Sequence, residues 1–421
     1  MELYCIYGNS AKEIFEKKKS LNHFIKKNRI MKSLNSKLCF MALAAGMFFF
    51  AACSSDNDNH EEENNGNIIE NGATLKGTIT SDVTLKAGNS YKLSGEYIVE
   101  NGAALNIEPG VTITAVGGDD VVDYILIKQG GKINASGTAE RPIVMTSTDT
   151  KEGAWGGIHI CGKARINVSG GTGKSEIGDA VYGGTDDADN SGILRYIRVE
   201  YSGYAFNPEK EANGITFYDV GNGTTVEYCE AYKGSDDGFE FFGGSVNVSN
   251  MVAVNCSDDS FDWTEGWRGT ATNLVAYQED KSTLGYDCDC LIEADNNENG
   301  FGLTPISHPI LKNLILAGNN SATNGRGIRL RRGTQVEISN AKVCGKKNAV
   351  TLESEETENA LLAGTSKLSG MTVDTALKSE KGIYTNDLFT GAGNKVDANL
   401  KYTSLEAIKA DCAWMAGNWV R

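Results

Sequence analysis

Short apolar runs recur along the chain, with almost no helical periodicity between them. One set reads YIRVEY, YCEAYK, NMVAVN, NLVAYQ, NLILAG and NAKVCG, and its members begin at residues 196, 228, 250, 273, 313 and 340. Successive starts are 32, 22, 23, 40 and 27 residues apart. A short repeat whose longer members carry insertions is typical of a right-handed parallel β-helix, in which each coil holds three strands and three turns. The pattern therefore predicts an all-β fold of this kind.

A second set of runs follows in the same coils: GIHI, GITF, GFEF, SFDW, LIEA, GIRL and AVTL. Because side chains alternate between the two faces of a strand, the flanking apolar residues, such as Phe239 and Phe241, are predicted to point into the coil. The middle residues then point outward and stack from coil to coil. We call these seven residues the outward row: His159, Thr216, Glu240, Asp262, Glu293, Arg329 and Thr351.

Both ends of the β-helix, which is expected over residues 73–402, need cover because an exposed edge strand promotes aggregation. Residues 75–95 are expected to form an N-terminal cap over the first coil. Residues 403–421 have helical spacing and bulky apolar side chains, and are expected to form a short helical cap at the other end.

The N-terminal part of the sequence has the features of a lipoprotein signal peptide at residues 31–52. The apolar run at 38–52 has 15 residues, which is short for a membrane span and typical of a signal core. It ends in Phe-Ala-Ala-Cys, which resembles a lipobox, so Cys53 is expected to carry the lipid. Residues 1–30 are basic and patternless, and are interpreted as a mis-assigned upstream start.

Residues 53–72 are polar and acidic, and are expected to form a disordered tether. The stretch also resembles the acidic export signal of surface lipoproteins of Bacteroidota. The resemblance implies an outer-membrane lipoprotein that is anchored through Cys53 and faces the cell exterior. A plain solvated linker is compatible with the same residues.

The charge balance restricts the partners. The chain has a formal charge of −15, and residues 1–52 hold nine of its 40 basic and three of its 55 acidic residues. The remainder, with 31 basic and 52 acidic side chains, has a formal charge of −21. Such a surface argues against nucleic acid and anionic membranes, and favours cations or neutral ligands.

Seven cysteines follow Cys53, so at least one is unpaired within the chain. Most are expected to be buried thiols, and the sequence does not decide whether two of them form one disulfide. Cys288 and Cys290 have no second cysteine pair or nearby histidine, so a zinc site is not expected.

Glu240, Asp262 and Glu293 would place three carboxylates about 4.8 Å apart on adjacent coils, where like charges repel. Two aspartate pairs precede the first two of these strands: Asp236, Asp237, Asp258 and Asp259. Three interpretations are open. The aspartates cap turns; the carboxylates bind a glycan or Ca²⁺, which takes 6–8 oxygen ligands; or crowded acids form a pair for acid–base catalysis.

The stretch GRGIRLRRG holds Arg326, Arg329, Arg331 and Arg332, the one basic cluster of the predicted β-helix. Arg329 follows Glu293 in the outward row, and either forms a salt bridge with it or clamps a carboxylate-bearing sugar. Trp267 is expected to be an outward aromatic residue that stacks on sugar rings.

The stretches DDGFEFFGG, DDSFDWTEGWRG, IEADNNENGFGLTPISHPILKNLILAG and GIRLRRG resemble, in this order, a group of exported bacterial β-helix lipoproteins. The resemblance covers roughly residues 100–350. It implies membership of the pectin-lyase-like superfamily, which includes pectate lyases, polygalacturonases and adhesins. A shared fold does not imply a shared activity.

The catalytic motifs of those enzymes are absent. The four histidines form no Gly-His-Gly, and no Arg-x-Pro-x-x-Arg stretch occurs, so no catalytic residue is assigned. The leading hypothesis is a cell-surface lipoprotein that binds a glycan or cation through Glu240, Asp262, Glu293, Arg329 and Trp267, and serves an outer-membrane transporter. A polysaccharide lyase or glycoside hydrolase that uses the four charged residues is one alternative, and a structural or adhesive protein is another.

Overall fold

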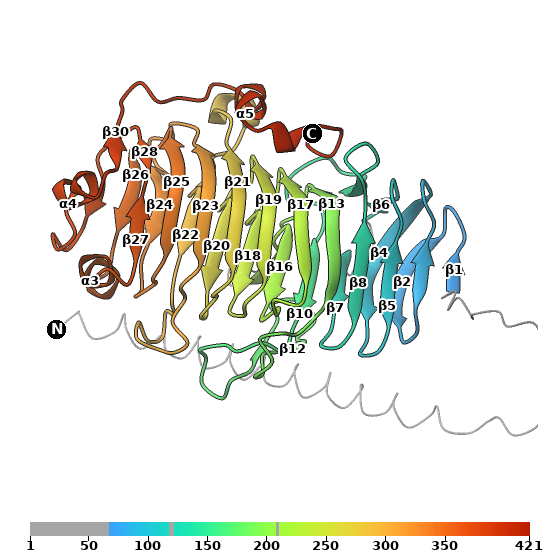
Figure 1. Cartoon of the computed structure of the whole chain (residues 1–421). Helices are drawn as coiled ribbons and strands as arrows, with labels where there is room; N and C mark the ends of the chain where they lie inside the picture. Colours follow the sequence, from blue (N-terminus) through green and yellow to red (C-terminus); the bar gives the residue numbers. More distant parts are fainter. Residues whose placement is uncertain (1–66, 118–121, 208–209) are drawn as a thin grey trace, which may run out of the picture. The chain divides into compact units, whose positions relative to one another are not determined.

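The computed structural model describes residues 67–117, 122–207 and 210–421. Within them the chain forms stacked coils, and the strands of each coil pair in parallel with those of the next in a sheet of 26 strands (Figure 1). The predicted parallel β-helix is therefore confirmed. Cys53 and the predicted segments at 1–30 and 31–52 lie outside the described residues. None of the described helices is long and apolar enough to cross a membrane.

Each coil contributes to three faces, which we call sheets 1, 2 and 3. Sheet 1 carries the outward row. Its strands are β7 (Tyr124–Ile127), β10 (Ile158–Cys161), β16 (Ile215–Tyr218), β18 (Phe239–Phe242), β20 (Phe261–Thr264), β22 (Ile292–Ala294), β24 (Arg326–Leu330), β26 (Asn348–Leu352) and β29 (Lys378–Ser379). Sheet 2 contains β1 (Asn67–Ile69), β3 (Val83–Leu85), β5 (Ala104–Ile107), β8 (Lys132–Ser136) and β27 (Lys367–Ser369). Sheet 3 contains β6 (Thr112–Ala115), β9 (Ile143–Ser147), β28 (Thr372–Val373) and β30 (Lys395–Val396).

Long strands bend from sheet 2 into sheet 3. They are β13 (Gly192–Glu200), β17 (Thr225–Tyr232), β19 (Asn247–Val254), β21 (Thr270–Tyr277), β23 (Ile310–Ala317) and β25 (Glu337–Cys344). Each bend has a residue with positive φ, for example Asn273 at 62° and Asn313 at 60°. Asparagine tolerates this conformation better than most residues. The side-chain amides of adjacent coils also bond to one another, with 3.0 Å from Asn313 Nδ2 to Asn273 Oδ1.

The first coils begin earlier than predicted. β1 pairs in parallel with β3, so residues 67–69 belong to the stack and not to the tether. The segment at 75–95, which was expected to cover the first coil, supplies strands of the stack itself. These are β3 and parts of β2 (Thr74–Ile79) and β4 (Ser90–Val99).

Two helices close the far end of the stack (Figure 1). Leu361 of α3 (Glu355–Ala363) and Phe389 of α4 (Asn386–Gly391) belong to the interior core, and Phe389 is fully buried. The C-terminal segment is helical, as predicted, in α5 (Leu405–Asp411) and the 3₁₀ turn η1 (Ala413–Met415). However, its position differs from the predicted cap over the end.

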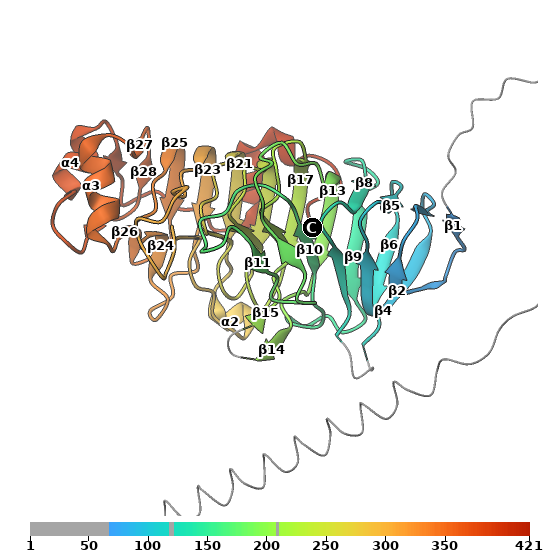
Figure 2. The ribbon, with the colours of Figure 1, turned by 90° about the horizontal axis from the view of Figure 1, so that it is seen from below.

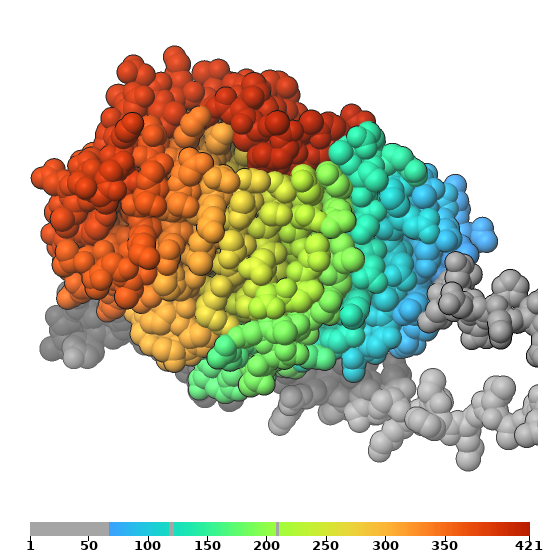
Figure 3. Space-filling view, viewed as in Figure 1, coloured from blue at the N-terminus to red at the C-terminus, as the bar shows by residue number. Residues whose placement is uncertain are grey.

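Residues 397–421, which we call the strap, run back along sheet 3 (Figure 3). They cover apolar side chains that point outward from this sheet, including Val252, Val275 and Ile315. The strap reaches β13, where Arg198 Nη1 donates to the carbonyl of Asn418 over 3.1 Å. The need to bury outward apolar residues explains why the segment lies along the flank instead of over the end.

Two inserted segments cover the early part of sheet 1. Residues 162–191 carry the short pair β11 (Gly173–Lys174) and β12 (Val181–Tyr182), and a second pair is β14 (Ala205–Asn207) with β15 (Lys210–Glu211). In Figure 2, β14 and β15 lie at the lower edge of the coils, whereas β11 lies over their middle. Ile177, Tyr182 and Ala212 from these segments pack on Leu126 and Tyr218 of sheet 1.

Candidate functional site

The outward row has the predicted order. The register pairs His159 with Thr216, Thr216 with Glu240 and Glu240 with Asp262. It continues from Asp262 to Glu293, then to Arg329 and Thr351. Beneath the row the flanking aromatic rings stack inside the coil, with Phe239 and Phe261 centred 5.5 Å apart.

The row is less exposed than a solvated face. His159 and Thr216 are fully buried, and Thr351 is 1% exposed. Tyr218 stacks on the His159 ring at 6.1 Å, within the cover formed by the inserted segments. Burial lowers the pKa of His159 to about 4, so this ring is neutral at physiological pH.

The middle of the row lines a hollow of about 380 Å³. We call it the acidic hollow. Its lining residues are Glu176, Glu211, Asp236, Asp237, Glu240, Asp258, Asp259, Asp262, Asp289, Glu293 and Arg329. Ten of these eleven residues are carboxylates, and they include the three acids of the outward row and both aspartate pairs that precede its strands.

Basic partners neutralise one side of the hollow. Arg329 Nη1 lies 2.6 Å from Glu293 Oε1, and its Nε lies 2.8 Å from Glu353 Oε1. Arg326 Nη2 lies 3.3 Å from Asp289 Oδ2. Of the two interpretations of Arg329, the salt bridge is therefore the one formed.

The other side has no such ion pairs, although the charge of Arg331 favours the ionised forms of Asp262 and Asp258. Eight lining carboxylates form no ion pair with a basic side chain among the described residues: Glu176, Glu211, Asp236, Asp237, Glu240, Asp258, Asp259 and Asp262. Their oxygens converge in three groups, in each of which one atom per residue lies within 4.8 Å of the others. The groups are Glu211–Asp236–Asp258, Asp237–Glu240–Asp262 and Asp237–Asp258–Asp259.

Loss of hydration on burial, together with neighbouring carboxylates, raises the pKa values of these groups. The pKa of Asp262 rises to about 7, that of Glu176 to about 7 and that of Asp258 to about 6. Burial and the charge of Glu176 hold the pKa of Glu240 well above its ordinary value. Without a bound cation, several of these carboxyl groups are therefore protonated near neutral pH.

Hydrogen bonds from the protein hold part of the cluster in place. Asp237 Oδ1 accepts from the Asp259 N–H at 2.9 Å, and Asp259 Oδ1 accepts from the Cys290 N–H at 2.7 Å. Asn213 Nδ2 donates to Glu240 Oε2 at 2.6 Å. By contrast, Asp262 Oδ1 is buried and has no hydrogen-bond partner among the described residues.

Trp267 is not a surface platform, and the prediction that it points outward is wrong. It is 1% exposed, its ring stacks on Phe241 at 4.1 Å, and its Nε1 donates to the carbonyl of Val246 over 3.1 Å. Glu265 and Gly266 both have positive φ. This turn ends the strand alternation and directs Trp267 into the interior core.

Sequence reasoning missed Glu176, Glu211 and Asn213. The two glutamates come from the inserted segments and reach the hollow from outside the coils. No repeat pattern marks them. Asn213 precedes β16 at the place where Asp237 precedes β18, and this alignment is the one signal that could have identified it.

All seven cysteines of the described residues are buried and unpaired, so these residues form no disulfide. Cys290 lies within 4.8 Å of oxygens of Asp259 and Glu293. Burial raises the pKa of its thiol well above the ordinary range. The thiol is therefore neutral in the metal-free protein.

Residues 77–421 match the family model described as the pectate-lyase-like β-helix domain. No curated protein and no solved structure matches the chain.

Proposed function

The chain belongs to the pectate-lyase-like β-helix family, and from this premise we propose that it is a carbohydrate-binding protein whose acidic hollow holds Ca²⁺. Through the cation, the hollow binds a sugar that carries a carboxylate. The observation that carries the proposal is the set of eight carboxylates without basic partners around one hollow.

The chemistry of the lining favours Ca²⁺. All eight uncompensated groups offer oxygen, the donor that hard cations prefer, and Ca²⁺ takes 6–8 such ligands in adaptable geometry. Asp237 belongs to two of the three oxygen groups and Asp258 to two, so neighbouring groups share ligands. A cation there also offers a partner to Asp262 Oδ1, which otherwise has none.

The same cation explains how so acidic a protein binds an acidic sugar. Without it, the carboxylates around Glu240 and Asp262 repel an anionic ligand. A divalent ion that keeps part of its coordination sphere open can accept oxygens of the ligand, which supplies both attraction and selectivity.

A second candidate, polysaccharide cleavage, rests on one observation. Asp262, with a pKa of about 7, lies next to Glu240, whose pKa burial also holds well above its ordinary value. Acids whose pKa values lie near the working pH suit proton transfer. Cleavage and binding would use the same residues, and only cleavage would form products.

One experiment tests both functions. The purified protein is mixed with neutral and acidic polysaccharides, with Ca²⁺ or with a chelator, and retention, new reducing ends and unsaturated products are measured. Ca²⁺-dependent retention of acidic polysaccharides without products is expected. Products that vanish in the Glu240→Gln/Asp262→Asn variant would establish cleavage instead, while neither retention nor products would leave a structural or adhesive protein.

The location is a separate proposal, which rests on the sequence of residues 31–72. We propose that Cys53 is lipidated, that the β-helix is displayed outside the outer membrane, and that it passes ligand to a transporter. Labelling of cells with a palmitate analogue should mark the wild type and not Cys53→Ser. If both are marked equally, the anchor lies elsewhere.

A further inference from the structure

Another hollow lies where the strap crosses the bend between sheets 2 and 3. Its volume is about 530 Å³, within the range of small-molecule sites. We call it the amide pocket. Its lining residues are Asn273, Asn313, Leu314, Ile315, Asn340, Lys342, Asp411, Cys412 and Trp414. None of these lines the acidic hollow, so the two sites are separate.

One wall of the amide pocket is a row of side-chain amides. Asn273, Asn313 and Asn340 hold the same position on β21, β23 and β25, and all three have positive φ. Asn340 Nδ2 donates to Asn313 Oδ1 at 2.8 Å, which continues the bond from Asn313 to Asn273. Asn273 Nδ2 in turn donates to Asn250 Oδ1 at 2.7 Å. These bonds fix the orientation of each amide before any ligand arrives.

The amides keep hydrogen-bonding capacity that a ligand can reach. A carboxamide has two N–H donors and an oxygen with two lone pairs. The row uses one donor and one lone pair of Asn313. Because Asn313 and Asn340 are both exposed, their remaining donors and acceptors are open to solvent or to a ligand. Sugar hydroxyl groups, which both donate and accept, match such a surface.

The opposite wall is Trp414 of the strap. Its side chain is partly buried, and its ring lies 6.0 Å from that of Trp419, which is fully buried. Trp419 packs edge-on against Tyr196 and Tyr228, which hold on β13 and β17 the bend position that asparagines hold on later coils. Packed rings thus close the bend on earlier coils. On later coils amides and a tryptophan surround a hollow instead, and this contrast points to a ligand.

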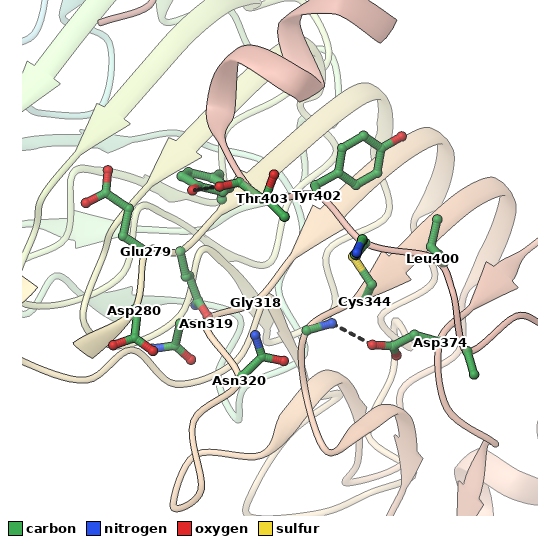
Figure 4. Close-up of a pocket in the computed structure, with 15 residues that line it drawn as sticks. Glu279, Asp280, Gly318, Asn319, Asn320, Cys344, Asp374, Leu400, Tyr402 and Thr403 are labelled. Carbon is green, nitrogen blue, oxygen red and sulfur yellow. Dashed lines mark hydrogen bonds between the residues drawn. The ribbon is translucent and has the colours of Figure 1, made fainter. Parts of the chain in front are cut away.

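The charges around the amide pocket offset each other. Lys342 and Asp411 are its charged lining residues, and Lys342 Nζ lies 3.0 Å from Asp411 Oδ2. Tyr402 Oη donates to the same oxygen at 2.7 Å. Figure 4 shows the Tyr402 hydroxyl turned away from Asn319 and Asn320, which line a separate hollow. In contrast to the acidic hollow, the amide pocket therefore favours an uncharged ligand.

We propose that the amide pocket binds a neutral saccharide. One face of a sugar ring lies on Trp414, where its C–H groups meet the aromatic surface. The ring hydroxyls exchange hydrogen bonds with the amides of Asn313 and Asn340. This site needs no cation, so the protein holds a neutral glycan independently of the acidic hollow.

The test uses the full-length protein and four neutral oligosaccharides: cellohexaose, mannohexaose, maltohexaose and xylohexaose. Saturation-transfer NMR identifies any of them that binds, and calorimetric titration gives its affinity. Trp414→Ala removes the stacking surface and should abolish measurable binding. Asn340→Gly removes one amide, while glycine still adopts the positive φ, and should weaken binding about tenfold.

The matched controls are Tyr204→Ala and Asn222→Gly, which remove an exposed aromatic ring and an exposed amide outside the amide pocket. Both should bind as the wild type does. Thermal melts establish that each variant is folded. Because Trp414 also packs beside Trp419, Asn340→Gly decides the test if Trp414→Ala does not fold.

A chelator should leave this binding intact, which separates the amide pocket from the proposed Ca²⁺ site. The proposal is wrong if none of the four oligosaccharides binds, or if the chelator abolishes their binding. It is equally wrong if a folded Trp414→Ala or Asn340→Gly variant binds as the wild type does.

Discussion

Glu240 and Asp262 occupy the same position on adjacent strands, with carboxyl oxygens within 4.8 Å of each other. Neither has a basic partner among the described residues. Directly beside them on the same strands, the rings of Phe239 and Phe261 stack in the core. The coils thus use interior packing to hold two acids close together, at a cost in stability that a bound cation would offset.

The first prediction concerns pH and Ca²⁺. Carboxyl groups with raised pKa values stabilise the folded state fully below their ordinary pKa, near 4, and this contribution is lost as the pH rises to about 7, where Asp262 and Glu176 titrate. The metal-free protein should therefore lose stability between about pH 4 and pH 7. Ca²⁺ should restore stability mainly above that window, by about 2.7 kcal/mol when free Ca²⁺ is ~100 times its Kd.

Thermal melts at about pH 5 and about pH 8, with and without CaCl₂, check this expectation. NaCl at equal ionic strength is the control, because general screening acts on all surface charges. An equal shift by both salts, or a larger Ca²⁺ effect at the acidic pH, would contradict a cation site in the acidic hollow.

The second prediction concerns Glu240→Gln combined with Asp262→Asn. The double variant should lose the Ca²⁺-induced stabilisation, since both residues belong to one oxygen group. Without metal and at neutral pH it should be more stable than the wild type, on the order of 2 kcal/mol, because it removes two carboxyl groups whose pKa values rise on folding. Chemical denaturation measures this difference.

Glu140→Gln with Asp387→Asn is the matched control, since it removes the same charge from exposed positions. This control should keep the response to Ca²⁺. If the two double variants behave alike, the effect belongs to net charge and not to the hollow.

The strand register was accessible from the sequence because it depends on a local signal. Apolar–variable–apolar runs such as GFEF and SFDW fix which side chains enter the coil, and a slip of one residue would turn Phe239 and Phe261 outward. The row Glu240, Asp262, Glu293 therefore followed from the alternation alone. The aspartates before the strands were placed by the same alignment.

The rest depends on contacts that no local pattern encodes. Trp267 enters the core because two consecutive residues of positive φ reverse the chain before it. Glu176 and Glu211 reach the hollow from insertions whose path is set by packing on Tyr218 and its neighbours. The strap follows the flank because strands of sheet 3 carry apolar side chains on both faces, and outward ones such as Val275 need cover. In the sequence, such outward residues cannot be told from residues of the interior core.

The third prediction separates structure from binding at Trp267. Trp267→Ala should destabilise the protein by about 3–5 kcal/mol, since it leaves a large cavity beside Phe241. Trp267→Phe should cost less because it keeps the ring contact and loses the hydrogen bond to Val246. Denaturant unfolding gives both values. A folded Trp267→Ala with wild-type stability and lost sugar retention would restore the surface role.

The fourth prediction concerns Arg329, which bridges Glu293 and Glu353. Arg329→Gln should destabilise the protein by about 2 kcal/mol, because it leaves two largely buried carboxylates without this partner. Glu227→Gln, which removes an exposed pair with Arg195, should cost about 1 kcal/mol or less. Equal costs for the two variants would show that Arg329 is as weakly coupled as a surface residue, and would favour its role as a ligand clamp.

The last prediction tests the bend between sheets 2 and 3 at Asn313, where φ is 60° and the side chain bonds to Asn273 and Asn340. Asn313→Ala should lose both hydrogen bonds and force a side chain into the left-handed region, at a cost of about 1–2 kcal/mol. Asn313→Gly should be less destabilising, since glycine adopts this φ freely and only the hydrogen bonds of the amide are lost. Chemical denaturation of the two variants separates these contributions. If Asn313→Gly lowers the free energy of unfolding as much as Asn313→Ala does, the hydrogen bonds between the amides stabilise the bend, and the backbone conformation does not explain why asparagine stands here.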